Sequence, residues 1–307
     1  MPPPSQRRVA LPPTAGLLLV VIFWAGNFTA TKVAFSEIGP LAFTALRFAM
    51  GSLIFWWVLR RVEGPGPALP APVLRKLILL GVLGNTVYQL FFVEGLMLVS
   101  ATKSALILAI LPVAVTAGAG LFRIEHVAPR QWYAVVIATI GVVMVLLARG
   151  GSIGGGLGLG DALLFGAVVA WAGYTLLLRR WVMPLSPLRV TAWTVYTGTP
   201  ILVLAAIPEL LGTDWGAISY IGWGGLAYST LLSLVAGYII WNRAVIEVGA
   251  SQTAVFNCLV PFIAALIAAL VLQERPALLH VLGGLLIVSG VLVAQRKSEK
   301  GEGRREK

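Results

Sequence analysis

The stretch Trp24-Ala25-Gly26 occurs again as Trp171-Ala172-Gly173, 147 residues further along this 307-residue chain. The same offset pairs Pro40-Leu41 with Pro187-Leu188. Later in the chain the offset becomes 149. There Ala101, Ala105, Pro112, Glu125 and Gly141 match Ala250, Ala254, Pro261, Glu274 and Gly290. The sequence therefore contains one internal duplication, and its two copies meet near residue 150.

The composition requires a membrane environment. Of all residues, 58% are hydrophobic and only 11% are charged, whereas about 25% are charged in a typical soluble domain. Apolar runs of about 20 residues, the length that spans a bilayer as a helix, recur between short polar connections. The predicted spans are 15–35, 41–59, 77–99, 102–122, 129–148, 160–180, 189–211, 217–241, 250–272 and 278–295. Barrel strands would be about ten residues long with alternating polarity, so we expect an all-α polytopic protein.

Each copy of the duplication holds five of the ten predicted transmembrane helices. Because five is odd, the second copy must enter the bilayer from the opposite side, which gives two inverted five-helix repeats related by a pseudo-twofold axis in the membrane plane. The expected segments are a cytoplasmic N-terminal segment (1–14), the first repeat (15–149), a Gly-rich linker (150–160), the second repeat (161–295) and a basic cytoplasmic tail (296–307). This architecture is typical of secondary transporters.

The basic residues predict the orientation in the membrane. With a cytoplasmic N-terminus, 18 of the 23 Lys and Arg residues fall in inner segments and four in outer connections. This bias follows the positive-inside rule, so both termini are expected in the cytoplasm. The formal net charge of +11 is thus a topology signal, and no basic stripe with interleaved aromatic residues indicates nucleic-acid binding.

Enzymatic activity finds no support in the sequence. There is no phosphate-binding loop and no His/Asp/Glu cluster, and the two histidines, His126 and His280, fall on opposite sides of the predicted membrane. The single cysteine, Cys258, excludes an internal disulfide and a cysteine-rich metal site. We therefore expect no catalytic residues, no metal and no cofactor, and we expect a small solute and the lipid bilayer as the partners.

Several motifs resemble the EamA-type branch of the drug/metabolite transporter superfamily. They are Phe23-Trp24-Ala25-Gly26-Asn27-Phe28 with Lys32, Pro40 and Arg47-Phe48, and later Tyr238-Ile-Ile-Trp241-Asn242-Arg243-Ala244 with Pro261 and Glu274. The resemblance covers about residues 15–295. It implies a multi-pass carrier of the bacterial inner membrane that exports amino acids or related metabolites, with aromatic-amino-acid exporters among the similar members. Another small solute or a drug-like cation is the alternative substrate, and a receptor or scaffold is the alternative class.

Polar and aromatic residues within the spans are the candidates for binding a solute, because a polar solute needs replacement hydrogen bonds inside the membrane. The predicted substrate-binding residues are Trp24, Asn27, Tyr88, Gln89, Trp171, Tyr174, Tyr238, Trp241 and Asn257. We expect them to line a cavity at the repeat interface that favours aromatic or bulky apolar amino acids. The alternatives are packing for the rings, helix bridging for Asn27 and Gln89, and a gate or interface anchor for Trp241.

Charged residues in or near the spans form a second group of candidates. Glu94 is either a proton-coupling group, a counter-charge for a substrate ammonium, or the partner of Lys32, Arg47 or Lys103. Arg47 itself is either a ligand for a substrate carboxylate or a donor that links helices. Glu125, with its counterpart Glu274, is expected to cap the last helix of its own repeat or to form a local salt bridge.

Two prolines are candidates for hinges. Pro112 and Pro261 occupy equivalent places in the two copies, and each frees a backbone carbonyl four residues earlier. Such a residue kinks a helix, so the pair is expected to act either as gating hinges or as fixed bends.

Overall fold

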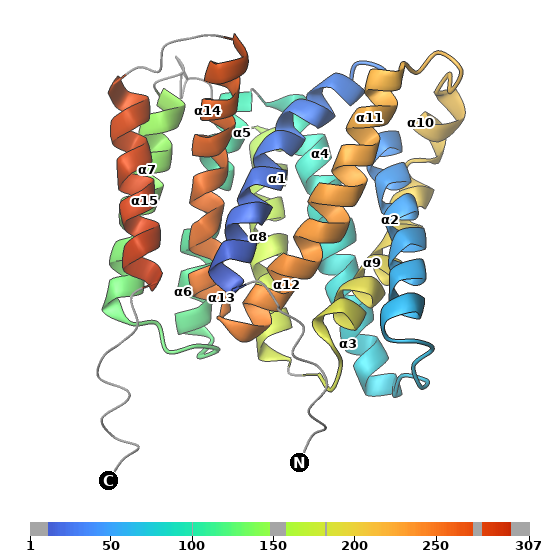
Figure 1. Ribbon diagram of the computed structural model, residues 1–307, viewed down its shortest axis with the longest axis horizontal. Coiled ribbons are helices and arrows are strands. Elements are labelled where there is room, and N and C mark those ends of the chain that lie inside the picture. The colour runs from blue at the N-terminus through green and yellow to red at the C-terminus, as the bar shows by residue number, and fades with distance from the viewer. Residues whose placement is uncertain (1–11, 100, 148–157, 182, 273–277, 296–307) are drawn as a thin grey trace.

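The computed structural model describes residues 12–99, 101–147, 158–181, 183–272 and 278–295, and all regular elements within these ranges are helices (Figure 1). The first repeat comprises α1 (Pro13–Ala34), α2 (Pro40–Val62), α3 (Ala71–Gly81), the π-helical turn η1 (Val82–Val87), α4 (Tyr88–Leu98), α5 (Ala101–Leu108), α6 (Leu111–Leu121) and α7 (Pro129–Leu147). The second comprises α8 (Leu159–Arg180), α9 (Pro187–Ala205), α10 (Ile207–Gly212), α11 (Tyr220–Tyr228), the π-helical turn η2 (Ser229–Ala236), α12 (Gly237–Glu247), α13 (Ala250–Ala254), the 3₁₀ turn η3 (Val255–Cys258), α14 (Leu259–Leu272) and α15 (Leu278–Gln295).

Helix boundaries repeat with the offset seen in the sequence. The continuous segment α3–η1–α4 covers 71–98 and α11–η2–α12 covers 220–247, a shift of 149 residues at both ends. Among the described residues, eight segments are long and apolar enough to cross a membrane. The threonine-rich α9 and the interrupted segment α13–η3–α14 complete two sets of five. The predicted fold class is thereby confirmed.

Several predicted boundaries differ from the observed ones; the seventh span, for example, ends at Ala205 rather than residue 211, and the short helix α10 follows it. The third span begins at Ala71 rather than residue 77, because the helix includes Arg75 and Lys76, which interrupt the apolar run. The eighth continues to Glu247 rather than residue 241, through the polar pair that follows Trp241. Helix α8 begins at Leu159, before the predicted linker ends, because the Asp161 carboxylate accepts a hydrogen bond from the Gly158 N–H (2.7 Å) and caps the first turn. The rest of the linker and the tail lie outside the described residues.

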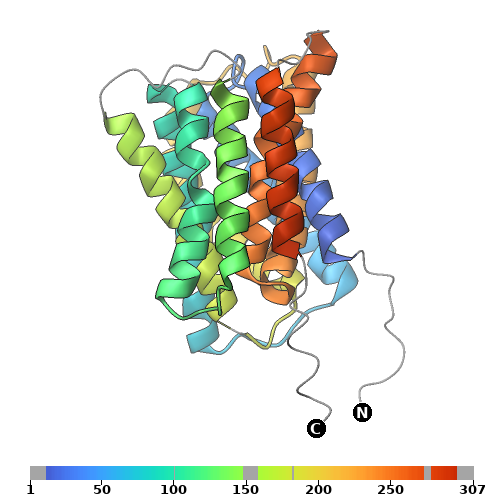
Figure 2. The same cartoon turned by 90° about the vertical axis from the view of Figure 1, so that its left-hand side faces the viewer.

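The two sets of helices run in opposite directions. Figure 1 shows the start of α1 and the end of α15 at the lower side of the molecule, which we call the N-terminal face. Helix α1 leaves this face, whereas α8, its counterpart, begins at the opposite face, as Figure 2 shows from the side. The arrangement is that of an inverted repeat.

The last helices of the two repeats, α7 and α15, pack side by side (Figures 1 and 2). A Cβ atom at Gly141 would lie 2.5 Å from the Gly283 carbonyl oxygen, and one at Gly290 would lie 2.6 Å from the Ala134 carbonyl oxygen. Gly290 is the counterpart of Gly141, and Gly283 is the counterpart of Ala134. The Gly141–Gly283 and Gly290–Ala134 contacts are therefore equivalent under the repeat symmetry. Glycine permits this close backbone approach, which supplies van der Waals contact where lipid removes the hydrophobic driving force.

The inverted arrangement predicts opposite accessibility for equivalent loops. Ala68 precedes α3 and Ala217 precedes α11 at the same repeat position, and both are exposed. In a Cys258→Ser background, we expect Ala68→Cys to react with a membrane-impermeant maleimide from the cytoplasm only and Ala217→Cys from outside only. Labelling of both from the same side of intact cells and inverted vesicles would rule out the inverted topology.

Candidate functional site

Equivalent residues of the two repeats touch each other across the repeat interface. The pairs are Trp24 with Trp171 (ring centroids 6.2 Å apart), Gln89 Nε2 with Tyr238 Oη (3.3 Å) and Ser52 Oγ with Thr199 Oγ1 (3.0 Å). Two residues related by a twofold axis can contact each other only beside that axis, as in a symmetric dimer. These contacts therefore locate the pseudo-twofold axis.

An aromatic cluster surrounds the axis. We define it as Trp24 of α1, Tyr88 of α4, Trp171 and Tyr174 of α8, and Tyr238 and Trp241 of α12. Trp171 is its centre, since its ring centroid lies 4.7–6.2 Å from those of the other five. Trp24 also lies 5.0 Å from Trp241. The tilted and edge-on geometries are those that aromatic pairs prefer, each contributing about 0.5–1.5 kcal/mol beyond burial.

Polar side chains and a backbone carbonyl hold the rings in place. The Tyr174 hydroxyl donates to Asn242 Oδ1 (2.9 Å), and Asn242 Nδ2 donates to Thr191 Oγ1 on α9 (3.0 Å). Trp24 Nε1 donates to the Ser233 carbonyl oxygen in η2 (3.1 Å). The cluster is thus connected to both α9 and a π-helical turn, and Asn242 is fully buried.

The two π-helical turns occupy equivalent positions, and each bonds the second helix of the other repeat. Thr86 of η1 donates to the Gly198 carbonyl oxygen on α9 (2.8 Å), and Ser229 of η2 accepts from Arg47 on α2 (3.0 Å). Insertions of this kind concentrate at functional sites. Hydrophobic periodicity gave no signal for them; the short polar runs in otherwise apolar spans, such as Asn85-Thr86, are the only trace in the sequence.

Several buried polar atoms near the aromatic cluster have no hydrogen-bond partner among the described residues. They are Asn27 Oδ1, Arg47 Nε, Trp241 Nε1 and both amide atoms of Asn85. Leaving such an atom unsatisfied costs about 1–3 kcal/mol. Their occurrence on helices that meet at the repeat interface fits a site that a polar solute completes.

The structure joins six of the nine predicted binding residues in the aromatic cluster, and Gln89 contacts it through Tyr238. Asn27 lies half-buried on α1, the helix that carries Trp24. Asn257 lies half-buried on η3, outside the ring contacts and hydrogen bonds described for the cluster. The rings pack against one another where the sequence predicts a cavity. A cleft of about 540 Å³ lies elsewhere, and it is lined by Ser52, Tyr196, Thr199, Pro200, Val203 and Leu204 of α2 and α9.

The three predicted charge-pair residues occupy different surroundings. Lys103 forms a salt bridge with Asp161 (2.8 Å), Arg47 is buried on α2, and Glu94 is exposed on α4. The Lys32 side chain lies outside the described residues. The ammonium of Lys103 is thus matched by a carboxylate at the start of α8.

Both candidate hinge prolines follow a break in a helix. Pro112 is the second residue of α6, which begins after the turn at 109–110 that ends α5. Pro261 is the third residue of α14, directly after the 3₁₀ turn η3. Proline is tolerated in the first turn of a helix because the N–H groups there have no helical partner.

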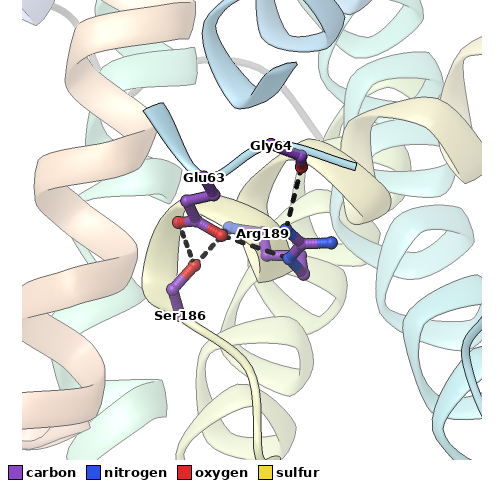
Figure 3. Close-up of polar contacts among 4 residues, drawn as sticks. All are labelled: Glu63, Gly64, Ser186 and Arg189. Atoms are coloured by element: carbon purple, nitrogen blue, oxygen red, sulfur yellow. Dashed lines mark hydrogen bonds and ion pairs between the residues drawn. The ribbon is translucent and has the colours of Figure 1, made fainter. Parts of the chain in front are cut away.

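On the N-terminal face, a carboxylate from the first repeat binds the start of a helix from the second. Glu63, just after α2, accepts hydrogen bonds from the Ser186 hydroxyl and from Arg189 Nε (3.1 Å), as Figure 3 shows. Arg189 Nη2 also donates to the Gly64 carbonyl oxygen (3.4 Å). We call this group the Glu63 latch.

The opposite face carries the counterpart. Glu209 of α10 accepts a hydrogen bond from the Ala42 N–H in the first turn of α2 (2.9 Å), and we call this contact the Glu209 latch. Gly39 and Ala42 correspond to Ser186 and Arg189 of the Glu63 latch. A Cβ atom at Gly39 would lie 2.3 Å from Glu209 Oε2, so glycine leaves the room that this carboxylate occupies.

Glu125 caps a helix of the other repeat, which corrects the predicted role. Its carboxylate accepts from the Ala250 N–H (2.7 Å) and the Ser251 N–H (3.2 Å) and pairs with Arg179 Nε (3.0 Å). A carboxylate at a helix N-terminus satisfies free N–H groups and the helix dipole. Gly249, with φ of 117°, adopts the left-handed region there, which glycine alone enters readily. Glu274 lies outside the described residues.

Comparisons with known proteins agree with this architecture. Residues 14–147 and 158–295 each match the EamA-like transporter family. The chain is 29% identical to the uncharacterized transporter YyaM of Bacillus subtilis, over 91% of this chain and 92% of that protein. It is 25% identical to a probable terminal-alkyne amino-acid exporter of Streptantibioticus cattleyicolor, over 92% and 93% of the two chains. A crystal structure with 19% identity superposes with a TM-score of 0.77 over 92% of this chain and 96% of the other, which shows the shared fold.

The inverted helical repeats with a polar and aromatic centre define a multi-pass membrane transporter rather than an enzyme. Because both repeats match the same family over most of the chain, this protein belongs to the EamA-like transporter family.

The latches predict opposite effects of equivalent substitutions. With Asn85→Cys as the reporter in a Cys258→Ser background, Glu63→Ala should increase maleimide labelling from the N-terminal face and Glu209→Ala from the opposite face. The partly exposed ion pair of the Glu63 latch contributes about 0.2–1 kcal/mol, so for Glu63→Ala we expect a population shift of up to about five-fold. Glu247→Ala, which removes only the exposed pair with Arg243 on α12, is the matched control. Shifts in the same direction for both latch variants would contradict separate closure of the two faces.

Proposed function

We propose that this transporter exports amino acids with aromatic or bulky apolar side chains by alternating access, and that the aromatic cluster binds them. The observation that carries the proposal is the position of the cluster on the pseudo-twofold axis. A site on that axis has the same surroundings whichever face is open, as a carrier's binding site must. The match to a probable amino-acid exporter supports the same substrate class.

The chemistry of the cluster suits such a substrate. Its six rings offer faces for stacking an aromatic side chain and for attracting an ammonium group, each contact contributing on the order of 1 kcal/mol. Four rings are almost fully buried, whereas Trp24 and Tyr88 are half-buried. Entry of a substrate therefore requires ring contacts to separate, and substrate contacts replace them. A drug-like cation is the second candidate, because the same ring faces bind a cation without a carboxylate.

The conformational exchange follows from the paired elements. In this proposal the N-terminal face is cytoplasmic and the membrane is the bacterial inner membrane, in agreement with the 18-to-4 distribution of basic residues. Release of the Glu63 latch opens the inner face and release of the Glu209 latch opens the outer one. Pro112 and Pro261, each beside a helix break, act as the hinges between these states.

Transport assays with ring-deletion variants test the proposal. In proteoliposomes, phenylalanine or tryptophan should show saturable counterflow. Trp171→Ala and Tyr88→Ala should each raise the half-saturation concentration about five-fold or more, because each removes about 1 kcal/mol or more of ring contact. Trp132→Ala, an exposed ring on α7, is the control and should leave it unchanged. Equal half-saturation concentrations in the wild type and both cluster variants would reject the assignment, and preference for an amine lacking a carboxylate would favour the second candidate.

A further inference from the structure

Arg47 is a buried positive charge in the middle of the molecule. Only 8% of the residue is exposed, and it lies on α2 next to the interface with the second repeat. Nη1 donates to Ser229 Oγ (3.0 Å), and the guanidinium lies over the Phe48 ring, 5.2 Å from its centroid. Nε has no hydrogen-bond partner among the described residues. The guanidinium carries five N–H donors in a planar fork, so it can donate further hydrogen bonds beside the one to Ser229.

No carboxylate of the described residues pairs with this charge. The salt bridges among the described residues are Lys103–Asp161, Arg179–Glu125, Arg189–Glu63 and Arg243–Glu247, and none of them includes Arg47. A buried charge without a counter-ion destabilises a protein, and charges inside membrane spans face partners or solute pathways. An arginine always keeps its proton, so it cannot escape this cost by becoming neutral. The balance indicates an anionic partner that is supplied from outside the chain.

The aromatic cluster lies beside the guanidinium. The Phe48 ring under Arg47 contacts Tyr238 of the cluster, with centroids 6.4 Å apart. A solute held on the rings therefore has a positive charge at one end of its site.

We propose that Arg47 binds the carboxylate of the transported amino acid and thereby selects amino acids over amines of the same side chain. This assignment rests on the proposed function, because it names Arg47 as the residue that binds the carboxylate of the proposed amino-acid substrate. The free Nε and an Nη group offer the carboxylate two parallel hydrogen bonds, the geometry in which arginine binds carboxylates most strongly. The ring faces receive the ammonium and the side chain.

Binding of the carboxylate also engages the π-helical turn η2. Ser229, the first residue of η2, accepts its hydrogen bond from the same guanidinium. A carboxylate bound by Nε and Nη2 leaves Nη1 on Ser229 but pulls on the same guanidinium. Occupancy of the site is therefore transmitted to a helix segment that also carries the carbonyl bonded to Trp24.

Paired transport substrates test the assignment. Counterflow in proteoliposomes is measured for phenylalanine and for 2-phenylethylamine, which lacks the carboxylate, with the wild type, Arg47→Gln and Arg47→Lys. For phenylalanine, Arg47→Gln should raise the half-saturation concentration about 10- to 100-fold, the expected loss for a hydrogen bond to a charged group. For the amine it should change less than about three-fold. Arg47→Lys keeps the charge but loses the fork, so its effect should be intermediate.

Two further variants separate binding from helix linking. Arg60→Gln changes an exposed arginine on the same helix and should behave as the wild type. Ser229→Ala removes the partner that Arg47 has in this structure but leaves its charge, so the preference for phenylalanine over the amine should persist. Size-exclusion profiles in detergent identify any variant that fails to fold. If Arg47→Gln fails to fold, the test is made instead by measuring equilibrium binding of phenylalanine and 2-phenylethylamine to Arg47→Lys.

The outcomes distinguish the two levels of the proposal. Loss of phenylalanine preference in Arg47→Gln, with the amine unaffected, supports the assignment. Equal loss of both solutes in Arg47→Gln, or an equal defect in Ser229→Ala, shows that Arg47 only links helices and overturns the assignment while the exporter function stands. Absence of saturable phenylalanine flux in the wild type overturns the proposed function, and the assignment with it.

Discussion

The contact between Trp24 and Trp171 is the interaction on which the rest of the structure depends. These are the same residue of two copies, and their rings meet edge to face across the pseudo-twofold axis. Because the axis passes between them, several contacts made by one repeat have a counterpart made by the other. The α7–α15 glycine contacts, the exchange of hydrogen bonds by the two π-helical turns and the two carboxylate latches are such pairs.

The symmetry is imperfect at the latches and beside the aromatic cluster. The Glu63 latch has a salt bridge to Arg189, whereas the Glu209 latch has only a backbone N–H donor at Ala42. Arg47 corresponds to Thr194 in the second repeat, so the positive charge beside the aromatic cluster is present once. A fully symmetric carrier would have equal energies for its two open states. Unequal latches give this protein a means to favour one of them, since only differential contacts shift such an equilibrium.

Much of the architecture followed from the sequence because membranes constrain it strongly. The fold class was predicted from span length, the odd number of spans per copy and the Trp24/Trp171 match. Six of the nine candidate binding residues chosen from the sequence lie together in the aromatic cluster. The residues that escaped prediction act through long-range pairing. Glu125 caps α13 of the other repeat, and Glu63 meets Arg189 across 126 residues of sequence. Helical periodicity describes one helix at a time, so it contains no information on such partners or on the π-helical turns.

Alternating access about the pseudo-twofold axis is the central claim. Its most direct test measures a spin-label distance across each face of the protein under the same conditions. Spin labels at residues 62 and 184 straddle the Glu63 latch, and labels at residues 36 and 211 straddle the Glu209 latch. In proteoliposomes, addition of phenylalanine on one side should lengthen one distance and shorten the other, with populations moving in opposite directions. Parallel lengthening of both distances, or a change at one face with none at the other, would contradict alternating access about the pseudo-twofold axis.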